Sequence, residues 1–152
     1  MSAGAAVKSL WPTTYLLIGI YKEKKLYKEH KVEGKTSDII AEIFSDILKT
    51  YQIKKIYYVN GPGSYMSIKV SYIFLKTVSI IHQIELLAIS GFELNQNSPI
   101  KAIGKKYFIQ KDDKIVLSDL GDMELREFNL PQSLENIKSS LDNLPNYVLP
   151  AV

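Results

Sequence analysis

The stretch from Lys54 to Ile89 constrains the fold most, because it predicts a strand, a long helix and a second strand in close succession. Residues 54–60, KKIYYVN, are typical of a buried strand and run straight into Gly61-Pro62-Gly63-Ser64, which ends it. Residues 65–82 have helical periodicity, and residues 85–89 form another short apolar run. Strands that alternate with a helix in this way predict a parallel α/β sheet.

An antiparallel hairpin is expected before this unit. Residues 15–21, YLLIGIY, and the more loosely alternating residues 25–32 are its two strands, and Gly34 ends it. Residues 1–9 are small and carry little information, so an expression remnant, a frayed terminus and a weak first strand all stay open.

The clearest helix prediction covers residues 36–51. Isoleucine, leucine and aromatic residues recur there at helical spacing, while Asp38 and other polar residues occupy the opposite face. Thr36 or Ser37 is expected to cap the first turn.

Composition changes after residue 94, where a polar segment ending in Pro99 predicts a linker. We therefore expect a domain over residues 1–94, a linker over 95–99 and a reduced α+β unit over 100–152. The smaller unit is predicted to contain strand pieces, a turn, a weak helix and an extended tail, at residues 100–103, 107–110, 111–114, 115–118, 131–141 and 145–150.

Composition narrows the classes of function. The 152 residues include no cysteine and two histidines, which excludes thiol catalysis and multi-histidine or cysteine metal sites. The net charge is +3, but Arg126 is the only arginine, so sequence-specific reading of nucleic acid is not expected. No apolar run is long enough to span a bilayer, and we expect a cytoplasmic protein without membrane contact. No catalytic or metal-binding residue is assigned.

The loop Gly61, Gly63 and Ser64 lies where a strand meets the start of a helix. Exposed N–H groups at such a point attract anions, so these residues are a candidate phosphate or nucleotide loop. A tight turn that merely requires glycine is the alternative, and the residues alone favour it, because neither the P-loop lysine nor a third glycine is present.

The helix over residues 65–82 lacks a polar face. Apolar side chains cover most of its circumference, and Lys69 and Lys76 share one narrow stripe bordered by Tyr65, Tyr72, Ile73 and Ile80. Such a helix must be covered on more than one side. A protein interface and burial within the same chain stay equally open.

Residues 54–90 together resemble the corresponding region of the TsaB (YeaZ) family. In that region a strand leads into GPGS and an aromatic residue, and a helix and a short strand ending in serine follow. The hairpin containing IGIYKEKKLYKE and the segment KAIGKKYFI also fall where that family has counterparts. This resemblance implies an actin-like, ribonuclease-H-like domain, with a truncated second unit in this chain.

The resemblance also implies a role. TsaB-type proteins are non-catalytic partners of the catalytic subunit TsaD and the small ATPase TsaE, which together form threonylcarbamoyladenosine in tRNA beside the anticodon. This chain would contact tRNA only indirectly, and ATP and a metal would lie on the partner subunits. The implied contacts with a TsaD-like partner are Tyr65, Ile68, Lys69, Tyr72, Ile73 and Lys76, beside the helix over residues 36–51.

The chain departs from the family pattern at the first loop, where Trp11-Pro12-Thr13-Thr14 replaces an Asp-Thr-Ser-like sequence. That loop has no acid to orient magnesium, so ATP hydrolysis by this chain is not expected. Two other readings stay open. One is a small ATPase or phosphotransferase of the actin-like superfamily that uses residues 61–64 as its phosphate loop. The other is a homodimer formed through the same helical surface.

Overall fold

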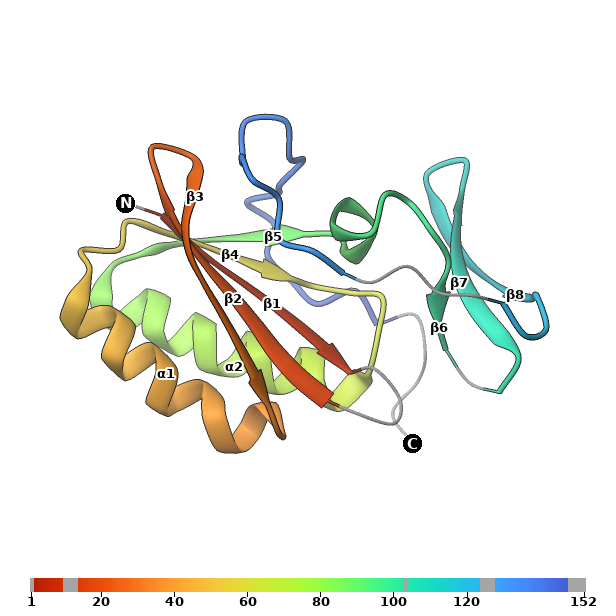
Figure 1. Ribbon diagram of the computed structural model, residues 1–152, viewed down its shortest axis with the longest axis horizontal. Helices are drawn as coiled ribbons and strands as arrows, with labels where there is room; N and C mark the ends of the chain where they lie inside the picture. The colour runs from red at the N-terminus through yellow and green to blue at the C-terminus, as the bar shows by residue number, and fades with distance from the viewer. Residues whose placement is uncertain (1, 10–13, 103, 124–127, 148–152) are drawn as a thin grey trace.

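The part of the chain that the structure describes is a mixed α/β fold with two sheets and two α-helices (Figure 1). The computed structural model describes residues 2–9, 14–102, 104–123 and 128–147. The larger sheet has five strands in the order β3-β2-β1-β4-β5, and the smaller sheet has the order β6-β7-β8. Strands β1, β2 and β3 pair antiparallel, whereas β4 runs parallel to β1 and β5 runs parallel to β4.

The first strand, β1 (Ser2–Ser9), is the central strand of the larger sheet. It pairs with β2 along its whole length and with β4 through residues 2–5. Of the three alternatives for residues 1–9, the structure therefore supports the strand. This strand has a paired strand on each side. The loop residues Trp11, Pro12 and Thr13 lie outside the described residues.

The predicted hairpin is confirmed as β2 (Thr14–Lys22) and β3 (Lys25–Glu33). Glu23 and Lys24 form its two-residue turn with φ of 53° and 65°, the left-handed geometry that such tight hairpin turns require. Strand β3 is an edge of the sheet, and its lysine and glutamate side chains are mostly exposed.

Both long helices occur where the sequence predicts them. Helix α1 (Thr36–Thr50) and helix α2 (Tyr65–His82) pack on one face of the larger sheet (Figure 1). The predicted cap of α1 is wrong: Lys35 is the N-cap residue and no side chain caps the helix, because Thr36 is already helical and is buried. Between the helices and strands β2, β4 (Lys55–Val59) and β5 (Glu85–Ile89) lies the main apolar core, which includes Ile18, Phe44, Ile56, Leu75 and Leu86.

A second apolar cluster joins the opposite face of the large sheet to the rest of the chain. Tyr15 and Leu17 of β2 and Val59 of β4 meet the 3-10 turn η1 (Gly91–Leu94) and Phe108 of the small sheet. The small sheet consists of β6 (Ile100–Lys101), β7 (Lys106–Lys111) and β8 (Lys114–Asp119), with Asp112 and Asp113 in the tight turn between β7 and β8. Ile103 of the predicted strand lies outside the described residues.

Residues 128–147 are here called the C-terminal strap. The strap starts on the face of the large sheet opposite the helices, where Phe128 and Leu130 pack, and then passes along the outer edge of β5 toward α2 (Figure 1). The helix predicted over residues 131–141 is wrong, because the strap contains no helix. Its backbone groups instead bond to other segments: Leu26 N donates to Gln132 O, and the amides of Ala88 and Ser140 exchange a reciprocal pair of bonds, each 2.9 Å long. Backbone groups that are already bonded to distant strands are not free to form the hydrogen bonds of a helix.

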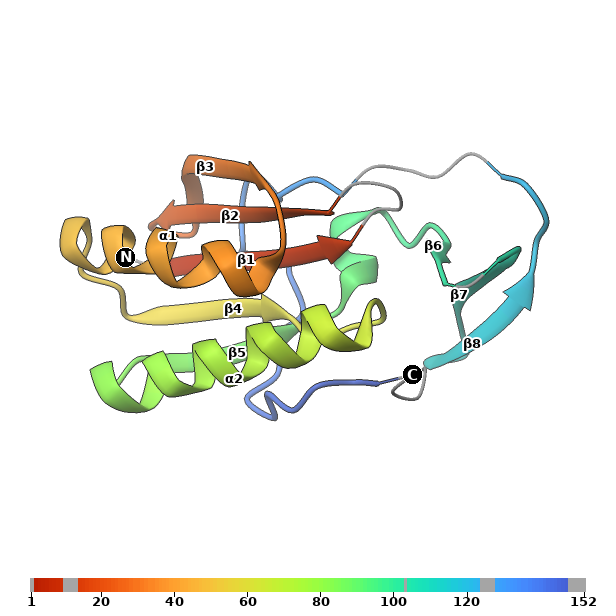
Figure 2. The same cartoon turned by 90° about the horizontal axis from the view of Figure 1, so that it is seen from below.

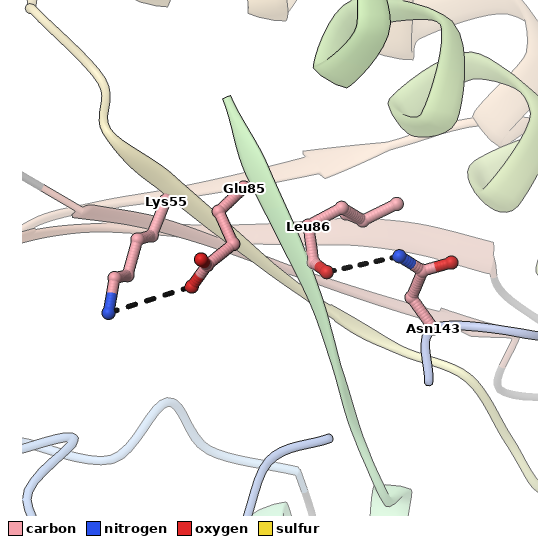
Figure 3. Close-up of polar contacts among 4 residues, drawn as sticks. All are labelled: Lys55, Glu85, Leu86 and Asn143. Carbon is pink, nitrogen blue, oxygen red and sulfur yellow. Dashed lines mark hydrogen bonds and ion pairs between the residues drawn. The ribbon is translucent and has the colours of Figure 1, made fainter. Parts of the chain in front are cut away.

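The strap also covers the outer edge of strand β5. Asn143 donates from Nδ2 to the carbonyl oxygen of Leu86 at 3.1 Å, close to the exposed ion pair between Lys55 and Glu85 (Figure 3). The backbone of Asn143 in turn accepts a hydrogen bond from the hydroxyl of Tyr58. The division of the chain at residues 94 and 100 stays a prediction. The strap residues Phe128 and Leu130 lie in the same apolar cluster as Tyr15 and Leu17 of β2.

Candidate partner-binding surface

Helix α2 lies along the outside of the sheet beside β4 and β5 (Figure 2). One side of the helix carries a row of exposed apolar side chains: Met66, Ile73 and Ile80 are 62%, 54% and 67% exposed. Residues seven apart are separated by almost two full turns, so these three lie in one stripe. Ile81 beside them is also exposed. The described residues therefore leave this side of the helix uncovered.

The opposite side of α2 faces the core. Ile68, Ser71, Leu75 and Val78 are buried there, and the hydroxyl of Ser71 donates to the carbonyl oxygen of Ser67 at 2.8 Å. Ile68 was predicted to contact a partner, but its side chain is only 4% exposed and turns toward Gly61 and Gly63. It supports the helix from inside, whereas the other five predicted contacts lie at or near the surface.

At the start of α2, the Tyr65 ring lies against the ring of Tyr147 from the strap, with ring centroids 4.6 Å apart. The ammonium group of Lys69, one turn along the helix, lies 5.7 Å from the centroid of the Tyr65 ring, within cation–π range. Partial burial raises the pKa of the Tyr147 phenol, and the neighbouring phenols of Tyr65 and Tyr72 raise it further.

Tyr72 is half-buried, and its side chain packs against the main apolar core. Its ring centroid lies 6.0 Å from that of Tyr58, a core residue of β4. Burial raises the pKa of Tyr58 above its ordinary range, and the nearest phenols, Tyr72 first, raise it further. Tyr72 therefore joins the core to the surface, Ile73 is its exposed neighbour, and Lys76 is half-buried.

The Gly61 loop is held on two sides. The amide of Gly91 donates to the carbonyl oxygen of Gly61 at 2.9 Å, and the amide of Asn146 donates to the carbonyl oxygen of Asn60 at 2.8 Å. Gly61 has a φ of +135°, and a Cβ there would lie 2.5 Å from the carbonyl oxygen of Asn146. Glycine is needed at this position because the strap passes so close.

Ser64 is the N-cap of α2, and its hydroxyl oxygen accepts from the amide of Ser67 at 3.5 Å. Gly63 is less constrained, since the nearest atom to an added Cβ would be Cδ1 of Ile68 at 3.8 Å. The part played by Gly61, Gly63 and Ser64 as a phosphate loop stays a prediction. The geometry accounts for Gly61 as a close approach of two backbones and for Ser64 as a helix cap.

This architecture matches solved structures. The structure described as "YeaZ from Pseudomonas aeruginosa" superposes with a TM-score of 0.55 at 12% sequence identity. A second, described as an uncharacterized protein with similarity to peptidase YEAZ from Pseudomonas aeruginosa, has a TM-score of 0.55 at 13% identity. The chain has a YeaZ-like fold. In both cases the match covers 78% of this chain and 64% of the other, so it spans less than two thirds of either solved structure.

At the level of sequence, no protein-family model matches the chain. A search of curated proteins likewise finds no match. The YeaZ-like assignment therefore comes from the three-dimensional arrangement of the elements.

Two absences apply to the residues that the structure describes. Among them, no cluster of three histidine, aspartate or glutamate side chains is arranged to hold a metal ion. Within the same ranges, no helix is both long and apolar enough to cross a lipid bilayer.

The sequence predicts Ile73 as a contact, but not Met66, Ile80 or Tyr147. The stripe formed by Met66, Ile73 and Ile80 follows from the seven-residue spacing once the buried side of the helix is known. The contribution of Tyr147 has no sequence signal, because it depends on the path of the strap across 82 positions of the chain.

Proposed function

We propose that the chain is a non-catalytic, TsaB-like partner subunit that binds a TsaD-like catalytic subunit through the exposed side of α2. One observation carries the proposal: a chain with a YeaZ-like fold leaves the apolar stripe of Met66, Ile73 and Ile80 uncovered. Apolar side chains gathered on one exposed helix face are a common feature of protein interfaces.

In this proposal the protein acts in the cytoplasm within the complex that forms threonylcarbamoyladenosine in tRNA. The larger sheet, an antiparallel hairpin followed by parallel strands, has the arrangement expected of an actin-like, ribonuclease-H-like domain. The partner would hold the nucleotide, the metal and the transferred group, and a TsaE-like ATPase would complete the assembly. This chain would supply a rigid docking surface and would touch tRNA only through its partner.

The structure favours some residues over others as contacts. Ile73 and Ile80 are the natural centre of the interface, because both are apolar and more than half exposed. Lys69 and Tyr65 would flank that centre, with the ammonium group already placed near the aromatic ring. A stable interface would bury at least about 1,000 Å² in total.

The test is co-elution of the purified chain with the TsaD-like protein of the same organism in size-exclusion chromatography. Ile73→Glu and Ile80→Glu should each weaken association at least about tenfold, because each places a charge in the centre of an apolar contact. Leu117→Glu is the matched control, since Leu117 is an exposed apolar residue of β8 in the smaller sheet and should leave association unchanged.

Thermal unfolding of all three variants should match that of the unaltered chain. Failure of the unaltered chain to bind, together with normal threonylcarbamoyladenosine levels in tRNA from a deletion strain, would overturn the proposal. If the unaltered chain binds but the glutamate variants bind equally well, the partner uses another face. A homodimer through α2 would appear as a dimer that the same two substitutions dissociate.

A further inference from the structure

A cavity of about 670 Å³ is lined by residues of the large sheet, the β7–β8 hairpin and the C-terminal strap. Asn60 and Ser90, which both line it, directly follow the parallel strands β4 and β5. In open α/β sheets, ligands commonly bind outside the carboxyl ends of parallel strands. The volume is within the range of small-molecule sites. No residue of the exposed stripe on α2 lines this cavity.

Two lysines from different elements line the cavity. Lys114 is the first residue of β8, and Lys138 belongs to the strap. Neither has an ion-pair partner among the residues that the structure describes. Of the described lining residues, only Asp113 carries a carboxylate, so the ammonium groups outnumber it. A lining with a net positive charge favours an anionic ligand.

Serine hydroxyl groups in the lining are free to donate hydrogen bonds. The hydroxyl oxygen of Ser90 accepts from the amide of Phe92 at 3.3 Å, and that of Ser140 accepts from the amide of Asp142 at 3.1 Å. A hydroxyl oxygen that accepts in this way keeps its O–H group for another acceptor. Phosphate oxygens are strong acceptors, and they pair with hydroxyl and ammonium groups alike.

Carboxamide side chains indicate the rest of the ligand. Asn60 donates from Nδ2 to the carbonyl oxygen of Leu144 at 3.2 Å, which leaves its Oδ1 available to accept. Gln110 and Asn146 each add a group that both donates and accepts, as the hydroxyl groups of a sugar require. The described lining contains no aromatic side chain on which a nucleobase could stack. These features favour a sugar over a nucleoside.

We propose that this cavity binds a small sugar phosphate, whose phosphate group is held by Lys114, Lys138 and the hydroxyl group of Ser140. The sugar hydroxyl groups pair with the carboxamide groups of Gln110 and Asn146. The proposal does not depend on the role given to α2.

The test is an NMR titration of the full chain with ribose 5-phosphate, following the backbone amides of Lys114 and Ser139 and the side-chain amides of Gln110 and Asn146. Saturable shifts with a dissociation constant of about a millimolar are expected, because the ligand is small and both lysines are exposed. Inorganic phosphate lacks the sugar hydroxyl groups and ribose lacks the phosphate group. Each should bind at least about fivefold more weakly than ribose 5-phosphate.

Lys114→Gln and Lys138→Gln should each weaken ribose 5-phosphate binding about fivefold, the effect of removing one exposed charge contact. Lys49→Gln, at an exposed position on α1, is the matched control and should leave binding unchanged. Urea unfolding of the three variants should match that of the unaltered chain, because all three lysines are exposed.

Three results would overturn the proposal. Non-saturable shifts would mean that the cavity holds no ligand of this class. Equal affinity for inorganic phosphate, or tighter binding of adenosine 5′-monophosphate, would exclude recognition of the sugar. Binding of ribose 5-phosphate that survives both Lys114→Gln and Lys138→Gln unchanged would place the phosphate group elsewhere.

Discussion

The ring of Tyr147 packs against the ring of Tyr65 with centroids 4.6 Å apart and planes inclined by 40°. One tyrosine comes from the C-terminal strap and the other from the first turn of α2. The contact therefore couples the end of the described chain to the helix that carries the candidate interface. It also makes the strap part of the surface that a partner bound at Tyr65 would meet.

This coupling is measurable in a double-mutant cycle. Tyr65→Ala and Tyr147→Ala should each destabilise the chain in urea unfolding, and the pair should show a coupling free energy of about 0.5–1.5 kcal/mol. Additive effects, with no coupling beyond error, would show that the two rings contribute independently.

A second prediction concerns the two glycines of the Gly61 loop. Gly61→Ala should destabilise the chain by at least about 2 kcal/mol, because alanine is strained at its positive φ and the new Cβ would collide with Asn146 O. Gly63→Ala should cost under about 1 kcal/mol, since its Cβ would make ordinary contact with Ile68. Urea unfolding compares the two variants. Equal losses would mean that the strap does not constrain Gly61.

A third prediction concerns the hydrogen bond between Asn143 and Leu86 (Figure 3). Asn143→Asp removes the donor and places a carboxylate beside a buried carbonyl oxygen, so it should cost about 1–3 kcal/mol. Amide exchange at Ala88 and Ser140 should accelerate, because the strap is then less firmly held to β5.

Lys55→Gln on the neighbouring strand is the matched control. It breaks the exposed ion pair with Glu85, whose atoms are 3.6 Å apart, and should cost under about 0.5 kcal/mol. Unchanged exchange at Ala88 and Ser140 in Asn143→Asp would contradict the role given to this hydrogen bond.

A fourth prediction concerns pH. Burial lowers the pKa of His30 below its ordinary value of 6.5, and the nearby charge of Lys28 lowers it further. The unfolded chain therefore takes up a proton at higher pH than the folded chain does. The resulting stability is present in full above about pH 6.5 and is lost as the pH falls from there through the lower pKa of the folded chain.

His30→Gln should flatten this dependence, so that urea midpoints at about pH 8 and about pH 5 differ less than they do in the unaltered chain. Lys28→Gln should reduce the same dependence by a smaller amount, because burial is the larger cause. An unchanged pH dependence in His30→Gln would assign the acid sensitivity to another group.

Local sequence patterns are sufficient to predict the two helices and the hairpin. Residues 65–82 were predicted to be helical and form α2 with the same bounds, and residues 85–89 form β5 as predicted. The clearest signals are the helical periodicity of residues 36–51 and the β-branched and aromatic side chains of residues 15–21, which give each segment a local preference of its own. The exposure of Ile73 and the burial of Ile68 could not be decided in this way, because they depend on which side of the helix the sheet covers.

By itself, the sequence determined the order and type of the main elements and the glycine-rich break between β4 and α2. Tertiary structure alone decided that residues 2–9 form the central strand and that residues 128–147 form an extended strap against the large sheet. Alanine and glycine have low β-strand propensity, so the formation of β1 depends on its pairing with β2 and β4. The strap likewise depends on bonds to residues at least 35 positions away, which no local pattern can encode.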